Sequence, residues 1–183
     1  TEADSGSFRT KNINEIKSIS DISGLEYFFF FPTTRFGNIT NQGNAIASKY
    51  KIIKTSMHKL FGNGEPRFLC CTTIKIKNKK INLFVTHLTL NFKDRQEQLK
   101  EINNILKSIK GTKILGGDLN IIREDELKHI DSLKRVSFLD TYPSWNPKKP
   151  LDNIFVSRDI KNYELSITKI KMSDHLGLIL EIK

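Results

Sequence analysis

The chain has 183 residues, of which 30 are lysine or arginine and 20 are aspartate or glutamate, so its formal net charge is +10. This length, with 27% charged and 38% hydrophobic residues, fits one globular domain and argues against a disordered tail or several domains. No apolar run approaches the roughly 18 residues that a membrane-spanning helix needs, which excludes an integral membrane protein for this segment.

The first half of the chain predicts one helix followed by short strands. Isoleucines recur at every third residue of a predicted helix over 12–22, which Gly24 ends; they are Ile13, Ile16, Ile19 and Ile22. Runs rich in Ile, Val, Phe and Thr follow, separated by turn-forming residues. They predict strands over 25–31, which Pro32 ends, and over 44–48, 52–57, 68–77 and 81–86.

The second half contains the clearest helix. Apolar residues at spacings of 3, 4 and 3 predict a helix over 94–109 with one buried stripe made of Leu99, Ile102, Leu106 and Ile109. A short strand over 113–115 follows, and three more strands are predicted over 151–157, 163–170 and 176–182. Strands outnumber helices and occur in consecutive groups, which favours an α/β or α+β fold with sheets packed face to face and helices outside.

The charge and the cysteines bear on partner and compartment. The basic excess favours a polyanionic partner such as nucleic acid or an anionic lipid surface, with a biased genome composition as the alternative explanation of the scattered lysines. Cys70 and Cys71, the only cysteines, are neighbours in a predicted strand and therefore point to opposite faces. They exclude a disulfide framework and favour the cytoplasm.

Five short polar segments lie at strand ends, where a scaffold presents side chains to solvent. Asp118 and Asn120 follow two glycines that permit a tight turn and the close approach of a ligand, and their spacing of two lets both side chains project to one side. His87 follows the strand 81–86. The remaining candidates are Asp152 at a strand start, Asp174 and His175 before the last strand, and Glu2 near the start of the chain.

These segments supply the groups that metal-dependent phosphoester hydrolysis needs. Mg²⁺ binds a few carboxylate oxygens, keeps several waters and takes substrate phosphate as a further ligand. The reaction also needs a group that orients or deprotonates water and a group near the developing charge, and a histidine held by a carboxylate suits the second role. Each segment alone has a structural explanation, such as an Asx turn or a capped strand end. Their joint occurrence favours a metal-dependent hydrolase.

With these motifs the sequence resembles the endonuclease/exonuclease/phosphatase superfamily of metal-dependent, DNase I-like phosphoesterases. The resemblance extends from Glu2 to the C-terminus. It implies a four-layered sandwich of two mixed β-sheets packed face to face with helices outside, and a site where the strand-end loops converge. The matching motifs are Glu2 in Thr1–Asp4, Gly43–Ile46 with Ser48–Tyr50, Thr86–Leu88, Arg95 with Gln98, Gly117–Asn120, Leu151–Ser157 and Ser173–His175.

The resemblance also implies roles. Glu2 would bind Mg²⁺, or alternatively Mn²⁺, with Asp174 as a second acidic ligand close to the metal or its water. Asp118 would orient or deprotonate the attacking water, and Asn120 would hold Asp118 or the phosphate. The histidine roles are implied in the same way: His175 is the catalytic histidine, as base, acid or phosphate stabiliser, Asp152 is its carboxylate partner, and His87 contacts a phosphate oxygen.

Other residues have both a functional and a structural interpretation. Arg9, Asn44, Arg67 and Arg95 lie near the site in this pattern, or belong to the surface and framework. The segments 31–42 and 144–150 are expected to be loops that frame the substrate. Trp145 in the second loop, with Lys148 and Lys149, offers a ring for base stacking and positive charge, or else it packs under the Pro-rich loop.

The resemblance also implies how complete the domain is and what the protein does. In the family, an N-terminal strand ending in asparagine, a helix and a second strand precede the metal-binding glutamate, so we expect residues 1–183 to form a single, N-terminally incomplete domain of reduced stability or activity. The leading hypothesis is a Mg²⁺-dependent phosphoesterase that hydrolyses phosphodiester bonds of nucleic acid by in-line attack of water. The alternatives are a phosphatase or lipid phosphodiesterase acting on an inositol phosphate or sphingomyelin, and a non-catalytic binding module.

Overall fold

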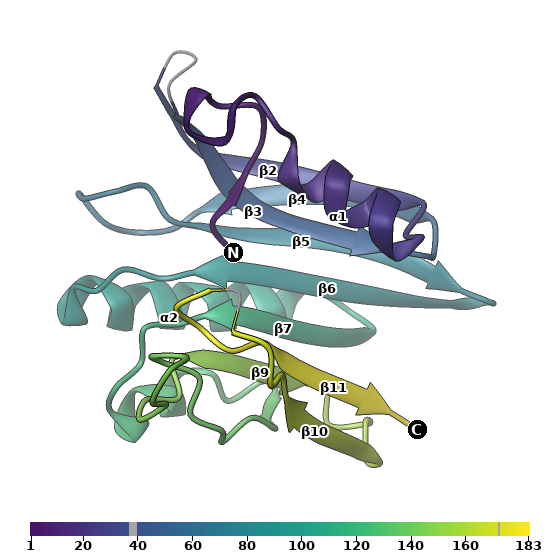
Figure 1. The fold of residues 1–183 in the computed structure, drawn as a ribbon. Coiled ribbons are helices and arrows are strands. Elements are labelled where there is room, and N and C mark those ends of the chain that lie inside the picture. The colour runs from purple at the N-terminus through teal and green to yellow at the C-terminus, as the bar shows by residue number, and fades with distance from the viewer. Residues whose placement is uncertain (37–39, 172) are drawn as a thin grey trace.

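The computed structural model of the protein describes residues 1–36, 40–171 and 173–183 and shows sheets layered between two helices (Figure 1). The largest sheet has six strands, in the spatial order β4 (Ile52–Lys59), β5 (Phe68–Ile76), β6 (Lys79–His87), β7 (Thr112–Asp118), β9 (Asp152–Val156) and β8 (Lys134–Arg135). A second sheet has the order β1 (Ala3–Asp4), β3 (Thr40–Ser48) and β2 (Tyr27–Phe36). The strands β10 (Tyr163–Ile167) and β11 (Leu178–Ile182) form a separate hairpin.

The layers confirm the sandwich that the sequence predicts. The helix α1 (Glu15–Ser23) packs on β2 and β3, and the helix α2 (Phe92–Ser108) packs on the six-stranded sheet. Between the sheets, the Asn44 side chain in β3 reaches the Cys70 thiol in β5, with 3.8 Å from Nδ2 to Sγ. None of the helices in the described part of the chain is long and apolar enough to cross a membrane.

The predicted first helix is correct in place, but its isoleucines do not form one buried stripe. Asn14 caps α1 by accepting a hydrogen bond from the Lys17 amide, and Gly24 ends it in the left-handed conformation. Of the four isoleucines only Ile16 is buried, whereas Ile22 is 88% exposed. In an α-helix, a step of three residues falls 60° short of a full circle. Side chains at a strict spacing of three therefore move progressively around the helix and away from the face that contacts the sheet.

Pro32 does not end the second strand. Strand β2 continues to Phe36, and its register with β3 shifts between Pro32 and Thr34. Proline lacks a backbone donor, and an edge strand with a bulge tolerates that loss. The segment 31–42 is therefore mostly hairpin strand instead of the expected loop, and its residues 37–39 lie outside the described residues.

The α2 stripe matches the prediction. Leu99, Ile102 and Leu106 are fully buried against a cluster that includes Phe84 and Leu115 of the sheet. Burial of each such side chain stabilises the fold by about 1.5–3 kcal/mol. The packing of α2 against the six-stranded sheet holds β6 and β7 in place.

The glycines before Asp118 lie inside β7 instead of in the expected turn. Gly117 has a φ of +146°, and a Cβ at this position would clash with the backbone carbonyl of Thr86 in β6. The close approach that glycine permits is thus between two strands and not to a ligand. It keeps β6 and β7 in the parallel register that pairs His87 with Asp118.

The last two predicted strands are shorter than expected at the ends that face the site. Leu180 of β11 packs against a small cluster containing Val156 and Ile160, which holds the hairpin on the six-stranded sheet. The segment between β10 and β11 is closed by a hydrogen bond from the Thr168 amide to the Gly177 carbonyl. This connection carries Asp174 and His175.

Candidate active site

Strand register places three predicted site residues side by side. His87 is paired with Asp118 across β6 and β7, and Asp118 is paired with Asp152 across β7 and β9. Directly paired residues point to the same face of a sheet, so the three side chains share one face at one edge. The edge is extended by hydrogen bonds from the Leu88 amide to the Asp118 carbonyl and from the Leu119 amide to the Leu151 carbonyl, both 3.0 Å.

The fourth residue, His175, arrives from the β10–β11 connection. Its Nδ1 lies 2.7 Å from Oδ2 of Asp152, and its Nε2 lies 3.9 Å from Oδ2 of Asp118. Ser144 anchors the connection, because its amide donates to the Asp174 carbonyl at 2.7 Å and its hydroxyl donates to the Ser173 carbonyl. The structure thus brings together the histidine and the carboxylate partner that the sequence pattern pairs.

Asp118 lies between the two histidines and has a raised pKa. The Asn120 amide donates to its Oδ1 at 2.9 Å, while Oδ2 faces the imidazoles of His87 and His175 at 3.6 and 3.9 Å. Burial raises the pKa of Asp118 from 3.8 to about 6, against the lowering effect of the Asn120 hydrogen bond. Such a carboxyl group can accept and release a proton near neutral pH.

The pKa values of the two histidines are shifted in opposite directions. Burial, followed by the positive charge of Arg67, lowers the pKa of His87 to about 4, so His87 is neutral at pH 7. Burial also opposes the charge on His175, but the hydrogen bond and the charge of Asp152, with the charge of Asp118, raise its pKa above 6.5. The site therefore combines one neutral imidazole with one that favours the protonated form.

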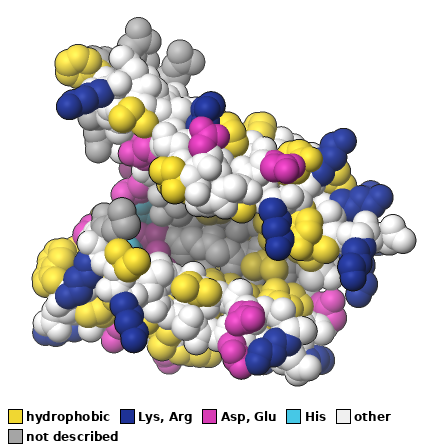
Figure 2. Space-filling model, turned by 45° about the vertical axis from the view of Figure 1, so that its right-hand side comes forward, with side chains coloured by type: hydrophobic (Ala, Val, Ile, Leu, Met, Phe, Trp, Pro, Cys, Tyr) yellow, Lys and Arg dark blue, Asp and Glu magenta, His cyan; other side chains and the backbone are white. Residues whose placement is uncertain are grey.

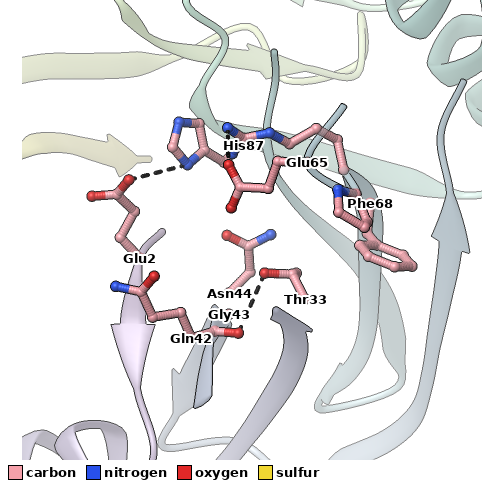
Figure 3. A pocket seen from close by; sticks show the side chains of 10 residues that line it. Glu2, Thr33, Gln42, Gly43, Asn44, Glu65, Phe68 and His87 are labelled. Atoms are coloured by element: carbon pink, nitrogen blue, oxygen red, sulfur yellow. Dashed lines mark hydrogen bonds and ion pairs between the residues drawn. The ribbon is translucent and has the colours of Figure 1, made fainter. Parts of the chain in front are cut away.

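Glu2 completes the cluster from the edge of the second sheet. Its Oε1 lies 3.6 Å from Nδ1 of His87, and Figure 3 shows the two side chains pointing toward each other. Figure 2 shows acidic and histidine side chains at the inner wall of a hollow, with lysines and arginines scattered over the surrounding face. A cavity of about 370 Å³ is lined by every predicted site residue except Asp152, namely Glu2, His87, Asp118, Asn120, Asp174 and His175.

Two site residues have a strained backbone. Glu2 has a φ of +55° and Asn120 a φ of +50°, in the left-handed region that residues other than glycine rarely adopt. The Asn120 side chain donates to the Leu88 carbonyl at 2.9 Å, which fixes this conformation. Asn120 therefore holds Asp118 through its backbone amide, while its side chain ties β6 to β7. Strain of this kind is concentrated at functional sites.

The oxygen donors fit a loosely held hard cation. Among the described residues, no group of three or more His, Cys, Asp or Glu side chains is arranged to hold a metal ion by itself. Mg²⁺ needs only one or two carboxylates when waters and substrate phosphate complete its shell. Glu2 and Asp174 are both exposed and line this cavity, so their carboxylates could contribute to such a shell.

The other candidates divide between site and framework. Arg67 lines the cavity, whereas Arg95 of α2 is buried in an ion pair with Glu126. Asn44 lines the small neighbouring cavity of Figure 3, and the side chain of Arg9 lies outside the described residues. Trp145 is 65% exposed, which excludes its packing under the loop.

Sequence reasoning missed three residues that line the cavity, whereas a fourth, Lys149, lies in the loop that was expected to frame the substrate. The Tyr142 ring lies 4.9 Å from the His175 ring, and Lys149 lies beside Tyr142. Leu90 and Ile122, 76% and 65% exposed, follow β6 and β7 just beyond the site residues. Leu90 lies three residues after His87 and Ile122 four residues after Asp118, which was a usable signal for these two, whereas no local pattern marks Tyr142.

A family model described as the endonuclease/exonuclease/phosphatase family matches residues 2–175. The chain belongs to the endonuclease/exonuclease/phosphatase family. Membership of this family supports a phosphoesterase. No curated protein sequence matches this family member.

Several solved structures have the same fold as this chain. A beta toxin variant from Staphylococcus aureus with bound magnesium ions is 20% identical, with a TM-score of 0.71, and the match covers 93% of this chain and 82% of the toxin. TDP2 from D. rerio, complexed with a single-strand DNA product, is 16% identical, with a TM-score of 0.69 and coverage of 89% and 79%. Sphingomyelinase C from Streptomyces griseocarneus is 12% identical, with a TM-score of 0.72 and coverage of 92% and 81%. These matches confirm the DNase I-like fold.

Proposed function

We propose that this protein is a divalent-metal-dependent phosphodiesterase that hydrolyses nucleic acid by in-line attack of water. The observation that carries the proposal is the position of Asp118 between two imidazoles, one of which, His175, is hydrogen-bonded to Asp152. This arrangement offers a proton acceptor and a group that stabilises negative charge within one cavity.

The roles follow from the protonation states. Asp118, with its pKa raised by burial to about 6, orients the attacking water and accepts its proton. His175, whose pKa is raised by the hydrogen bond and charge of Asp152 against the opposing effect of burial, faces the charge that develops on the phosphoryl group or on the leaving oxygen. His87, which is neutral, donates a hydrogen bond to a phosphate oxygen.

Glu2 and Asp174 are the residues that would hold Mg²⁺ at the cavity wall. When bound, this cation supplies Lewis acidity and neutralises charge on the phosphate. The magnesium ions in the similar beta toxin variant support this choice of cation.

The net charge of +10 supports nucleic acid as the substrate, because basic surfaces gather polyanions. The single-strand DNA product in the similar TDP2 structure supports it as well. A second candidate is a lipid phosphodiester, since the exposed Leu90 and Ile122 give the cavity an apolar mouth, and a similar structure is a sphingomyelinase C.

The metal requirement is tested by melting temperature. We expect millimolar Mg²⁺ to raise the melting temperature of the protein, because a ligand that binds only the folded state stabilises it. Glu2→Gln should abolish the shift. The matched control is Glu97→Gln, which removes an exposed carboxylate on α2 and should keep it. A shift of equal size in Glu2→Gln would contradict the assignment.

The substrate is tested with a panel at fixed Mg²⁺ that contains single-stranded DNA, abasic duplex, RNA, inositol phosphates and sphingomyelin. We expect turnover of a nucleic acid, abolished by EDTA. Turnover of sphingomyelin alone would favour the second candidate, and no turnover of any member would contradict the enzymatic proposal.

A further inference from the structure

Arg67 lies in the wall between two cavities, and the chemistry assigned above does not use it. It is the residue just before β5, and its carbonyl accepts a hydrogen bond from the Leu60 amide at 2.8 Å, which fixes its backbone. Its side chain is only 15% exposed. It lines the active-site cavity and also the small cavity of Figure 3, together with Glu2 and His87 in both.

The guanidinium group is incompletely satisfied by the protein. Its Nη2 donates to Oε2 of Glu65 at 2.8 Å, whereas its Nε is buried and has no hydrogen-bond partner among the described residues. A guanidinium carries five N–H donors in a rigid fork, and burying a donor without a partner is costly. The Nε is too buried to reach a ligand, so the donors left for one are the Nη N–H groups that the Glu65 contact does not use.

Glu65 holds this guanidinium in place. Its Oε1 accepts a hydrogen bond from the Thr34 hydroxyl of β2 at 3.2 Å, while its Oε2 accepts from Arg67. Each oxygen of one carboxylate thus has a separate partner, on different segments of the chain. The ion pair thereby links the Arg67 guanidinium to the β2–β3 hairpin.

The cavity is lined by two cationic side chains, Arg67 and Lys149, which favour an anionic substrate. The carboxylates of Glu2, Asp118 and Asp174 line it, and their field repels a phosphodiester. Arg67 lines both cavities together with Glu2 and His87, which places its side chain close to the reacting region. A planar fork of donors matches two phosphate oxygens better than any other side chain does.

We propose that Arg67 binds the non-bridging oxygens of the substrate phosphate and that Glu65 positions it for this contact. This inference rests on the proposed phosphodiesterase function and adds a substrate-binding residue to it.

The kinetic test uses bis(p-nitrophenyl) phosphate with Mg²⁺. We expect Arg67→Ala to lower kcat/KM by about 10- to 100-fold and Arg67→Lys to restore only part of the loss. The matched control is Arg158→Ala, because Arg158 is exposed and follows β9 at the end opposite the site. If the wild-type protein cleaves neither this ester nor any member of the substrate panel, the proposed function fails. If it cleaves the ester and Arg67→Ala stays within twofold, only the present inference fails.

A second test separates substrate binding from a structural role. Added guanidinium at millimolar concentration should restore part of the activity of Arg67→Ala and leave the wild-type and Arg158→Ala proteins unchanged. Inorganic phosphate with Mg²⁺ should raise the melting temperature of the wild-type protein more than that of Arg67→Ala. An Arg67→Ala protein that melts lower, is not rescued and keeps the full phosphate shift would show a structural role and overturn the proposal.

Discussion

Two ion pairs of similar length have opposite surroundings in this protein. Arg95 of α2 contacts Glu126 at 2.9 Å, and its Nη1 donates to the carbonyls of Thr89 and Leu90; the pair is 5% and 0% exposed. His175 contacts Asp152 at 2.7 Å, but the pair is 24% and 22% exposed, and the other imidazole nitrogen faces the cavity.

The comparison teaches how a structural pair differs from a functional one. A pair whose donors and acceptors are all used inside the protein contributes to folding, because loss of one member leaves a buried charge. A pair that keeps one polar atom directed at an open cavity can act on a ligand. The same criterion separates Arg95 from Arg67, which keeps Nη N–H groups that the Glu65 contact does not use.

Asp118→Asn should cause the largest loss of activity, and it should increase the stability of the fold. The amide keeps the shape and can still accept the Asn120 hydrogen bond, but it cannot take a proton, so turnover should fall by about 10²- to 10⁴-fold. The pKa of Asp118 is raised from 3.8 to about 6, so the favourable effect of protonation on stability is lost as the pH rises through this range. At pH 7 with EDTA, Asn should therefore stabilise the fold by up to about 3 kcal/mol.

Both effects are measured on one preparation, by steady-state hydrolysis and by urea unfolding in EDTA. Asp140→Asn, at an exposed aspartate, is the matched control and should change neither quantity. Near-normal metal-dependent hydrolysis by Asp118→Asn would remove Asp118 from the mechanism.

Arg95→Ala should have the second largest effect, on stability alone. It leaves the carboxylate of Glu126 buried without its cation, which costs about 3–5 kcal/mol. The measurement is the urea midpoint, combined with activity per folded molecule at low temperature, which should stay near normal. Replacing both partners, with Arg95→Met and Glu126→Leu, should recover much of the stability; a double variant as unstable as Arg95→Ala would contradict the desolvation argument.

Asp152→Asn should have an intermediate effect through His175. The hydrogen bond and charge of Asp152 raise the His175 pKa, so this pair stabilises the fold fully below pH 6.5 and less as the pH rises through the raised value. The variant should lower that pKa, which NMR titration of the imidazole measures in EDTA. A charged hydrogen bond contributes about 1.5–3 kcal/mol, so turnover should fall by about 10- to 100-fold. An unchanged His175 pKa would contradict the pairing.

Much of this site could be predicted because its residues lie at strand ends in recognisable motifs. His87, Asp118 and Asp152 follow or begin apolar runs that are easy to identify as strands, and pairing of those strands then brings them together. The Asp152–His175 contact could be expected only from the family pattern, since the two residues are 23 positions apart and no local rule joins them.

The rest depended on tertiary context that no local pattern contains. Pro32 was expected to end a strand, but its position on an edge strand removes the penalty. Gly117 was expected to permit the close approach of a ligand, but in the structure its missing side chain permits the close approach of β6. Arg67 and Arg95 could not be told apart in sequence, because the difference lies in which carboxylates and carbonyls surround each guanidinium.

Lys17→Ala should have the smallest effect on stability, because it removes an ion pair that is exposed to solvent. Lys17 and Asp21 form a 2.9 Å pair on α1, but the side chains are 60% and 63% exposed, so water and salt screen the attraction. Removal should change the free energy of unfolding by less than about 0.5 kcal/mol, as measured by urea unfolding at low and high salt. The three pairs have similar lengths, so a loss as large as that of Arg95→Ala would mean that distance, and not burial, decides what an ion pair contributes.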